Sequence, residues 1–421
     1  MNILTNTPET PAPAIPAATS RLSDGLWRAA MVFLAIMPVG MTIAHRSSPL
    51  FLGLSAATAI AAAWAEGDLG ESLRRAGASL RSPLGMAVLA LAAWTLSSVG
   101  WSEVRGLSLD AVGEFWLPVA FGFVLVPLLA NRLTTRAFWV LVVAVCLSQI
   151  LMVMDLRSDL VVRKALGMRG DSYIFNRTSL TLLVLLPGLV AFAANRIRPG
   201  RLLASGLYAI VTLAIVNSDS GAGVLGLVAG TLVLGLAWAA PAAAAWLMRI
   251  VFVAAMVLAP VFGPLSDALI PDRVLESFSR NHSRARVDIW HSFDAAIRAQ
   301  PILGAGFGAS ALLNETSVAA RVPEANRVLL GVGHPHNAPI QVWTELGVVG
   351  AVLAGLVGLL AMQRIDGLPR AGRALGLALA AAIFSVGMIG HGAWQGWWAA
   401  AIGAAFVWLK AAGIGAREDE G

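Results

Sequence analysis

About twelve stretches of mainly apolar residues, each long enough to cross a bilayer as a helix, dominate this sequence of 421 residues. A membrane-spanning helix needs roughly 17–25 such residues. With 57% hydrophobic and 13% charged residues, the chain is too apolar for a soluble domain of this length. We therefore predict an all-α, polytopic membrane protein. The candidate spans lie near residues 27–44, 49–65, 83–101, 112–130, 137–155, 178–195, 202–217, 222–240, 244–262, 343–362, 374–391 and 394–412.

The arginines between these spans predict the orientation of the chain. Short cytoplasmic loops of membrane proteins carry an excess of Lys and Arg, and here the arginine-rich short loops fall on the side of the N-terminus, which is therefore predicted to be cytoplasmic, as is the C-terminus. Because the arginines are scattered through loops, the net charge of +6 does not indicate a nucleic-acid partner. The predicted order is a disordered cytoplasmic tail (1–26), helices 1–9 (27–262), a large outer loop (263–341), helices 10–12 (342–412) and a cytoplasmic tail (413–421).

Two outer segments, 156–177 and 263–341, break the charge pattern because both are rich in arginine. Contacts with lipid headgroups or nearby carboxylates would explain any single arginine, since longer loops cross regardless of charge. The cluster as a whole favours an anion on the outer side, because a guanidinium pairs bidentately with phosphate. The candidates for this role include Arg169, Arg177, Arg284 and Arg286.

Within the large outer loop, residues 284–299 have the spacing of an amphipathic helix. Val287, Trp290, Phe293 and Ile297 recur on one side, which predicts a helix lying at the membrane surface. Gln300-Pro301 ends this helix, and the following "GAGFG" allows a tight turn and a close backbone approach. Because this glycine run follows no predicted strand, it does not indicate a dinucleotide site.

The stretch "GVGHPHN" stands directly before the tenth span and holds His334, His336 and Asn337. Pro335 predicts a rigid turn, and Asn337 or a neighbouring residue is expected to cap the helix that follows. Two histidines with no further His or Cys nearby are too few for a zinc site, and the single Cys146 lies inside a span. Any chemistry is therefore predicted to need neither a metal nor a cofactor.

These residues resemble the O-antigen ligase and polymerase superfamily. His336-Asn337, nine residues and then Gly347-x-x-Gly350 are similar to the His-(Asn/Ser/Gln)-x9-Gly-x-x-Gly motif of that family. Upstream, "RVDIW" from Arg286 to Trp290 and the following "PILGAGFG" resemble its Arg-x-x-x-Trp and Pro-x-x-Gly-x-Gly segments. The large loop between the ninth and tenth spans also matches the family arrangement.

The resemblance implies a glycosyltransferase in the bacterial inner (cytoplasmic) membrane whose catalytic loop, 263–341, faces the periplasm. Such enzymes move a glycan from undecaprenyl pyrophosphate to lipid A core, for a ligase, or to a second lipid-linked glycan, for a polymerase. By match to the motifs, His336 is the implied general base and Arg286 the implied pyrophosphate-binding residue. The further candidates for substrate binding are Arg284, Arg177, Arg169, His334 and Asn337.

One turn departs from the ligase pattern. Ligases carry a Ser-Arg-Gly-type element before the eighth span, but the corresponding turn here, "NSDSGAG", has Ser220 at the place of that arginine. Either Arg177 or another residue of 157–177 supplies the missing charge, or the chain is a polymerase with a different site. A transporter is a third alternative, because about twelve spans also suit that class. Against it, the sequence has no repeated half and few ionisable residues within the spans.

Overall fold

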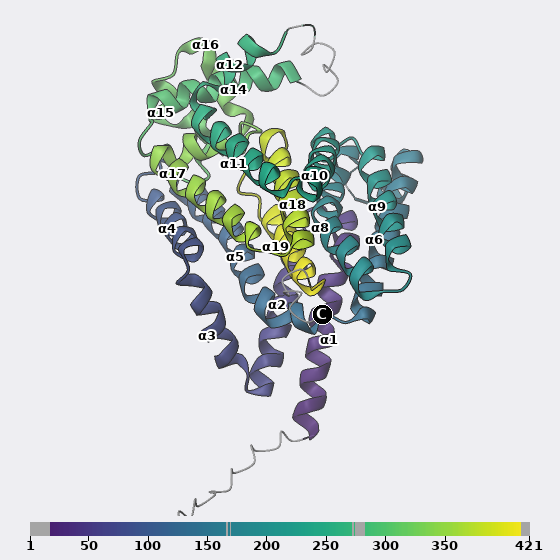
Figure 1. The fold of residues 1–421 in the computed structure, drawn as a ribbon. Coiled ribbons are helices and arrows are strands. Elements are labelled where there is room, and N and C mark those ends of the chain that lie inside the picture. Colours follow the sequence, from purple (N-terminus) through teal and green to yellow (C-terminus); the bar gives the residue numbers. More distant parts are fainter. Residues whose placement is uncertain (1–16, 166, 169, 272, 274–282, 414–421) are drawn as a thin grey trace, which may run out of the picture.

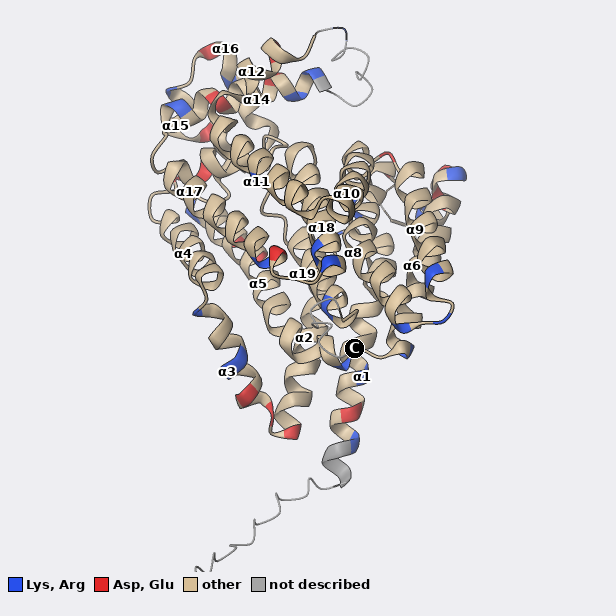
Figure 2. Ribbon diagram, in the orientation of Figure 1, with Lys and Arg blue, Asp and Glu red and all other residues tan. Residues whose placement is uncertain are grey.

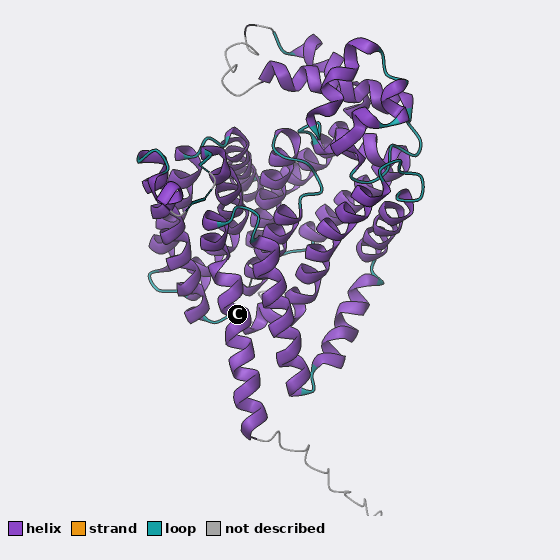
Figure 3. Cartoon of the chain, turned by 180° about the vertical axis from the view of Figure 1, so that it is seen from behind, coloured by secondary structure: helices purple, strands orange, loops and turns teal. Residues whose placement is uncertain are grey.

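A computed structural model describes residues 17–165, 167–168, 170–271, 273 and 283–413. Within these ranges the chain forms helices and loops without any strand (Figure 3). The α-helices are α1 (Ala17–Ile43), α2 (Ser48–Glu66), α3 (Leu69–Leu80), α4 (Pro83–Ser98), α5 (Arg105–Leu129), α6 (Thr135–Arg157), α7 (Val161–Ala165), α8 (Phe175–Arg196), α9 (Gly200–Asn217), α10 (Gly221–Ala239), α11 (Pro241–Leu258), α12 (Phe262–Leu269), α14 (Ser283–Ala299), α15 (Ser317–Ala320), α16 (Glu324–Arg327), α17 (Ala338–Asp366), α18 (Arg370–Ile389) and α19 (Gly396–Ala411). Short 3₁₀ helices are η1 (Ala130–Arg132), η2 (Ser172–Ile174), η3 (Ala259–Val261), η5 (Ala309–Glu315) and η6 (Val328–Val332).

The long helices confirm an all-α polytopic membrane protein. Among the described residues, ten helical segments are long and apolar enough to cross a bilayer, and the pair α3–α4, bent by 84°, would make an eleventh. The last predicted span corresponds to α19, which has only 16 residues. Figure 2 shows many of the charged residues in the layer of short helices at one end and near the ends of the long ones.

Helix α19 runs through the middle of the bundle, which explains how so short a helix is accommodated (Figure 1). Trp397 and Trp408 are both fully buried there, and α19 packs against α5 and α8. Its many alanines let the neighbouring helices approach closely, which is how helices associate in lipid. The core of the protein therefore surrounds the last helix of the chain.

The predicted disordered tail, 1–26, is wrong for residues 17–26, because α1 already begins at Ala17. Ser23, in this early part of the helix, is buried, and the indole of Trp27 donates a hydrogen bond of 2.8 Å to Glu66 of α2. Packing against α2 therefore stabilises turns of α1 that a hydropathy pattern leaves out. Residues 1–16 and 414–421 lie outside the described part of the chain.

A layer of short helices, α12 and α14 to α16 with η5 and η6, covers one end of the bundle, and we call it the outer layer (Figure 1). The helix predicted over 284–299 is confirmed as α14. Its apolar side faces protein and not the membrane surface, since Val287, Phe293 and Ile297 are buried in one cluster with residues of η5, α15, η6 and α17. A period of apolar residues cannot distinguish these two environments.

The two glycine motifs meet where the chain after α14 crosses α17. Gly347 interrupts α17 with φ 63° and ψ −165°, and the amide of Val348 donates to the carbonyl of Pro301 at 2.8 Å. Ala305 and Gly306 donate in turn to the carbonyls of Thr344 and Glu345, both at 2.8 Å. A Cβ on Gly347 would collide with the backbone of Ile302. The motifs "PILGAGFG" and Gly-x-x-Gly are thus two halves of one backbone crossing.

Candidate active site

Three hydrogen bonds hold the turn that carries the histidines. The indole of Trp290 donates to the carbonyl of Pro335 at 3.0 Å, the ring Nδ1 of His336 lies 2.6 Å from the carbonyl of Gly390, and Asn337 caps α17 by accepting from the amide of Ile340 at 3.0 Å. His336 has φ 51°, a left-handed conformation that residues other than glycine rarely adopt. Such a conformation persists only where the surroundings fix it, and strained residues cluster at functional sites.

The hydrogen bond to Gly390 determines which nitrogen of His336 carries the proton. A carbonyl oxygen can only accept, so Nδ1 donates and Nε2 of the neutral ring keeps its lone pair. Burial lowers the pKa of His336, and the nearby positive charge of Arg286 lowers it further, although the Gly390 contact opposes this. The ring is nevertheless only half-buried. His336 therefore offers a neutral, accessible acceptor nitrogen.

His334 offers a hydrogen-bond donor where His336 offers an acceptor. Its Nδ1 accepts a hydrogen bond of 3.3 Å from the backbone amide of His336, which leaves Nε2 as the protonated nitrogen of the neutral ring. Burial, with the charges of His336, His391 and Arg177, lowers the pKa of His334 to about 3. The two rings lie 4.1 Å apart between centroids. One acceptor and one donor thus stand side by side.

The spacing of Arg286 and Trp290 places both on the same side of α14, one helical turn apart. Trp290 joins the helix to Pro335, as described above, and Arg286 lies close enough to His336 to lower its pKa. Arg286 is half-buried, and no carboxylate lies within 4.0 Å of it among the described residues. An arginine held in this way can receive an anion.

A second arginine reaches the same histidines from α8. Arg177 lies 5.6 Å above the Trp397 ring, and its charge lowers the pKa of both His334 and His391. The neighbouring Arg163 has a different task, because its guanidinium donates to the carbonyls of Thr42 and Ile43 at the end of α1. Among the described residues of the cationic segment 156–177, Arg177 thus joins the histidine cluster.

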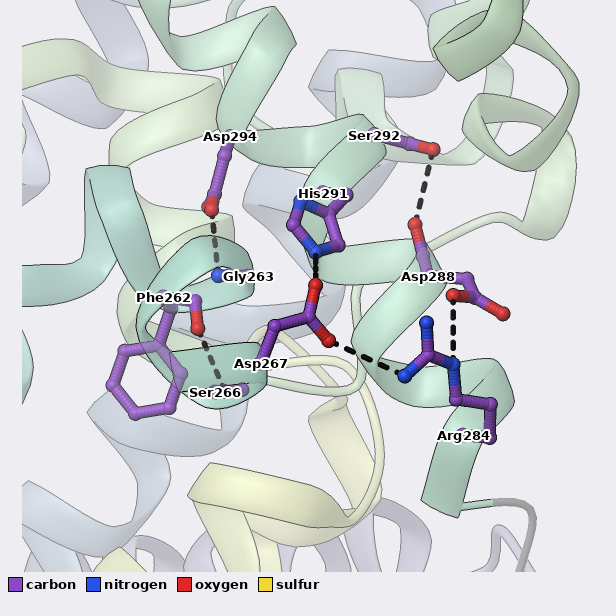
Figure 4. Close-up of polar contacts among 9 residues, drawn as sticks. All are labelled: Phe262, Gly263, Ser266, Asp267, Arg284, Asp288, His291, Ser292 and Asp294. Carbon is purple, nitrogen blue, oxygen red and sulfur yellow. Dashed lines mark hydrogen bonds and ion pairs between the residues drawn. The ribbon is translucent and has the colours of Figure 1, made fainter. Parts of the chain in front are cut away.

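Two of the other candidates, Arg284 and Asn337, make structural contacts of their own. Arg284 turns to α12, where it forms an ion pair with Asp267 at 3.3 Å, and it also pairs with Asp288 of its own helix α14 at 3.5 Å (Figure 4). Asn337 is fully buried as the helix cap, and its Nδ2 has no partner within the described part of the chain. Arg169 lies outside the described residues. Ser220, at the turn that departs from the ligase pattern, caps α10 by accepting from Gly223 at 3.1 Å.

Two residues that sequence reasoning missed, His391 and Glu345, lie in or contact the connection between α18 and α19. His391 donates from Nδ1 to the Gly392 carbonyl at 2.8 Å, and its buried Nε2 has no partner among the described residues. Glu345, fully buried in α17, accepts from the amide of Gly308 at 2.5 Å and from the Trp394 indole at 2.7 Å. A glutamate within an otherwise apolar span was the available signal for this second residue.

The fold and the site together define a polytopic membrane protein with a histidine- and arginine-lined site where its outer layer meets the helical bundle. Residues 206–355 match the family described as O-Antigen ligase, a range that includes His336, Arg286 and both glycine motifs. This confirms the resemblance to the O-antigen ligase superfamily over those residues. Arg177 and His391 lie outside the matched range.

The chain is also similar to proposed polysaccharide ligases of two Rickettsia species. It is 30% identical over 196 residues to the one from Rickettsia prowazekii, and 28% identical over 196 residues to the one from Rickettsia typhi. Each alignment covers 46% of this chain and 47% of the relative. The similarity thus spans about half the length of the relatives that it matches.

Proposed function

We propose that this protein is a glycosyltransferase of the ligase type, which moves a glycan from undecaprenyl pyrophosphate to lipid A core on the periplasmic face of the bacterial inner membrane. The observation that carries the proposal is the protonation pattern of His336. Its Nδ1 is fixed as a donor by Gly390, so Nε2 is free to take a proton from an acceptor hydroxyl. The family match and the named relatives support the same class of reaction.

In the proposed step, His336 Nε2 takes the hydroxyl proton while the acceptor oxygen bonds to the anomeric carbon of the glycan. The bond from that carbon to the pyrophosphate oxygen breaks, and undecaprenyl pyrophosphate leaves with the electron pair. Its negative charge is stabilised by Arg286 and Arg177, which approach the histidines from two different elements. The Nε2–H of His334 donates to an oxygen of the bound donor. The residues therefore need neither ATP nor a metal for this scheme.

Arg177 bears on the choice between ligase and polymerase. Ser220 is a helix cap and carries no charge, whereas Arg177 lies beside the histidines and supplies the second cation. This favours a ligase site in which the arginine comes from α8. Polymerisation of lipid-linked repeat units is the second candidate, because it uses the same donor and differs only in the acceptor.

The test is transfer by the purified full-length protein, with a lipid-linked glycan as donor and either lipid A core or a second lipid-linked glycan as acceptor. His336→Ala should lower the rate by roughly 10²–10⁴-fold, the usual loss for a general base. His334→Ala should keep a measurable fraction, because it loses a donor and not the base. Activity should survive EDTA. If His336→Ala transfers at the normal rate, the assignment of His336 as the base is wrong. If the parent protein transfers no glycan to either acceptor, the glycosyltransferase proposal is wrong, and uptake into vesicles would test the transporter alternative.

A further inference from the structure

A cleft and a groove run along α1 and α6 at the end of the bundle opposite the histidines. The cleft, of about 810 Å³, is lined by Arg28 on α1 and by Thr135 and Arg136 on α6. The groove, of about 580 Å³, continues between the same two helices past Trp139 and Val143. Both volumes lie in the range of ligand-binding sites, roughly 300–1,000 Å³.

The cleft and the groove form one continuous surface, because Arg136 and Val140 line both. Along the groove the side chains are apolar and face outward: Trp139 is 43% exposed and Val143 63%. In a membrane protein such outward apolar side chains contact acyl chains. A ligand that fills both parts therefore has a polar end at Arg28 and Arg136 and a long apolar end.

The polar end is suited to an anion. Arg28 and Arg136 form no ion pair among the described residues, whereas Arg132, which lines the same cleft, is already paired with Glu66 at 2.8 Å. Asp24 also lines the cleft and leaves the two unpaired arginines in excess. The first turn of α6, a helix of 23 residues, adds the positive end of its dipole at Thr135 and Arg136.

The position excludes the glycan donor of the proposed reaction. Glu103, just before α5, accepts hydrogen bonds from Ser317 of the outer layer, so α5 begins at the end of the bundle that holds the histidines. Helix α6 therefore begins at the other end, beside the N-terminal turns of α1 (Figure 1). The arginine pattern of the loops predicts this end to be cytoplasmic.

We propose that this surface binds one anionic phospholipid of the leaflet opposite the candidate active site. Its phosphate lies between Arg28 and Arg136, and one acyl chain follows the groove past Trp139 and Val143. Basic pockets between spanning helices bind anionic headgroups in this way. The proposal is independent of the transfer reaction, since no histidine or arginine of the candidate active site takes part.

The experiment is native mass spectrometry of the delipidated full-length protein, titrated with phosphatidylglycerol or with phosphatidylcholine of the same acyl chains. One phosphatidylglycerol should bind more tightly than phosphatidylcholine. The double variant Arg28→Ala, Arg136→Ala should weaken phosphatidylglycerol binding roughly 30-fold, given the usual contribution of each arginine near an anionic headgroup. The matched control is Arg74→Ala, Arg75→Ala on α3, whose arginines pair with Glu71 and should leave binding unchanged.

A further variant separates a lipid from a free anion. Val143→Trp fills the exposed groove and should weaken phosphatidylglycerol binding, while binding of inorganic phosphate, followed by calorimetry, stays as it is. Equal binding of the two lipids, or an equal loss in the α3 control, would overturn the proposal. If Val143→Trp has no effect and inorganic phosphate competes fully, the surface takes a free anion and the lipid assignment is wrong. Thermal unfolding of each variant checks that it is folded.

Discussion

The carbonyl oxygen of Gly390 lies 2.6 Å from the ring Nδ1 of His336, so the connection between α18 and α19 fixes the ring that stands before α17. The two residues are 54 positions apart in sequence. Such a contact orients an imidazole and selects its tautomer in the way that a second group orients the histidine of hydrolase triads.

The pH dependence of transfer should show the lowered pKa of His336. A general base acts in its neutral form, and burial favours that form. The acid limb of kcat/KM is therefore expected below the ordinary histidine value of about 6.5. The measurement is the rate of glycan transfer between pH 4.5 and 8, with thermal stability followed over the same range. An acid limb above the ordinary value would contradict the assignment of His336 as base.

Replacement of Arg286 should separate charge from geometry. Arg286→Ala is expected to abolish transfer while the protein still accumulates in the membrane, because this half-buried side chain forms no ion pair among the described residues. Arg286→Lys should also lose most of the activity, since an ammonium group cannot form the two parallel hydrogen bonds of a guanidinium. The neighbouring Arg284→Lys, whose parent side chain pairs with Asp267, is the matched control and should transfer normally. Full activity of Arg286→Lys would mean that only positive charge is needed there.

The backbone crossing can be tested on one helix. Gly347→Ala should destabilise the protein by roughly 1–3 kcal/mol or more, because φ 63° is unfavourable for alanine and its Cβ would meet Ile302. Gly355→Ala, eight residues further along α17, meets no atom within 4 Å and should be neutral or slightly stabilising. Thermal unfolding in detergent would compare the two. Similar melting temperatures for both variants would argue against the crossing.

Asp294 should make the stability of the outer layer depend on pH. Burial raises the pKa of Asp294 to about 6, although the hydrogen bond that it accepts from the amide of Gly263 acts in the opposite direction and lowers the pKa (Figure 4). A raised carboxyl pKa means that the folded state holds the proton more tightly, so this contribution to stability is lost as pH rises through about 6. Asp294→Asn, which cannot ionise, should gain in melting temperature relative to the parent between pH 5 and pH 7.5. If the difference in melting temperature between Asp294→Asn and the parent is the same at pH 5 and pH 7.5, Asp294 ionises with an ordinary carboxyl pKa.

The orientation of the chain can be tested with one added cysteine. Asn314 is exposed in η5, within the outer layer. With Cys146 replaced by Ser, Asn314→Cys should react with an impermeant maleimide in intact spheroplasts, because the basic short loops predict this layer to be periplasmic. Labelling only after lysis would reverse the topology and the placement of the site.

Local sequence patterns predicted the features that depend on residues close together in the chain. The apolar lengths predicted the spans, Asn337 was correctly expected to cap α17, and the period of 284–299 predicted α14. Contacts between distant segments left no local pattern. That Arg284 pairs with Asp267 while Arg286 approaches His336 depends on how α14 lies between α12 and the histidine turn.

The same limit explains the missed residues. His391 was missed in the sequence, because its position beside His334 results from packing of the α18–α19 connection against the turn before α17. Glu345 was overlooked within an apolar span. The structural role of Glu345 depends on hydrogen bonds that it accepts from two other segments, from the amide of Gly308 and from the indole of Trp394. Only the folded chain brings these together.

The helical stretch between Asn337 and Gly347 fixes the distance between the histidine turn and the backbone crossing. The cap fixes one end of it, and the crossing with Ile302 fixes the other. Ten residues of α-helix measure about 15 Å, and one inserted residue would turn the far end by about 100°. A chain with such an insertion could keep either its histidine turn or its crossing in place, but not both. The nine residues between the two parts of the motif therefore set a fixed distance. We expect this interval to tolerate substitutions far better than insertions or deletions.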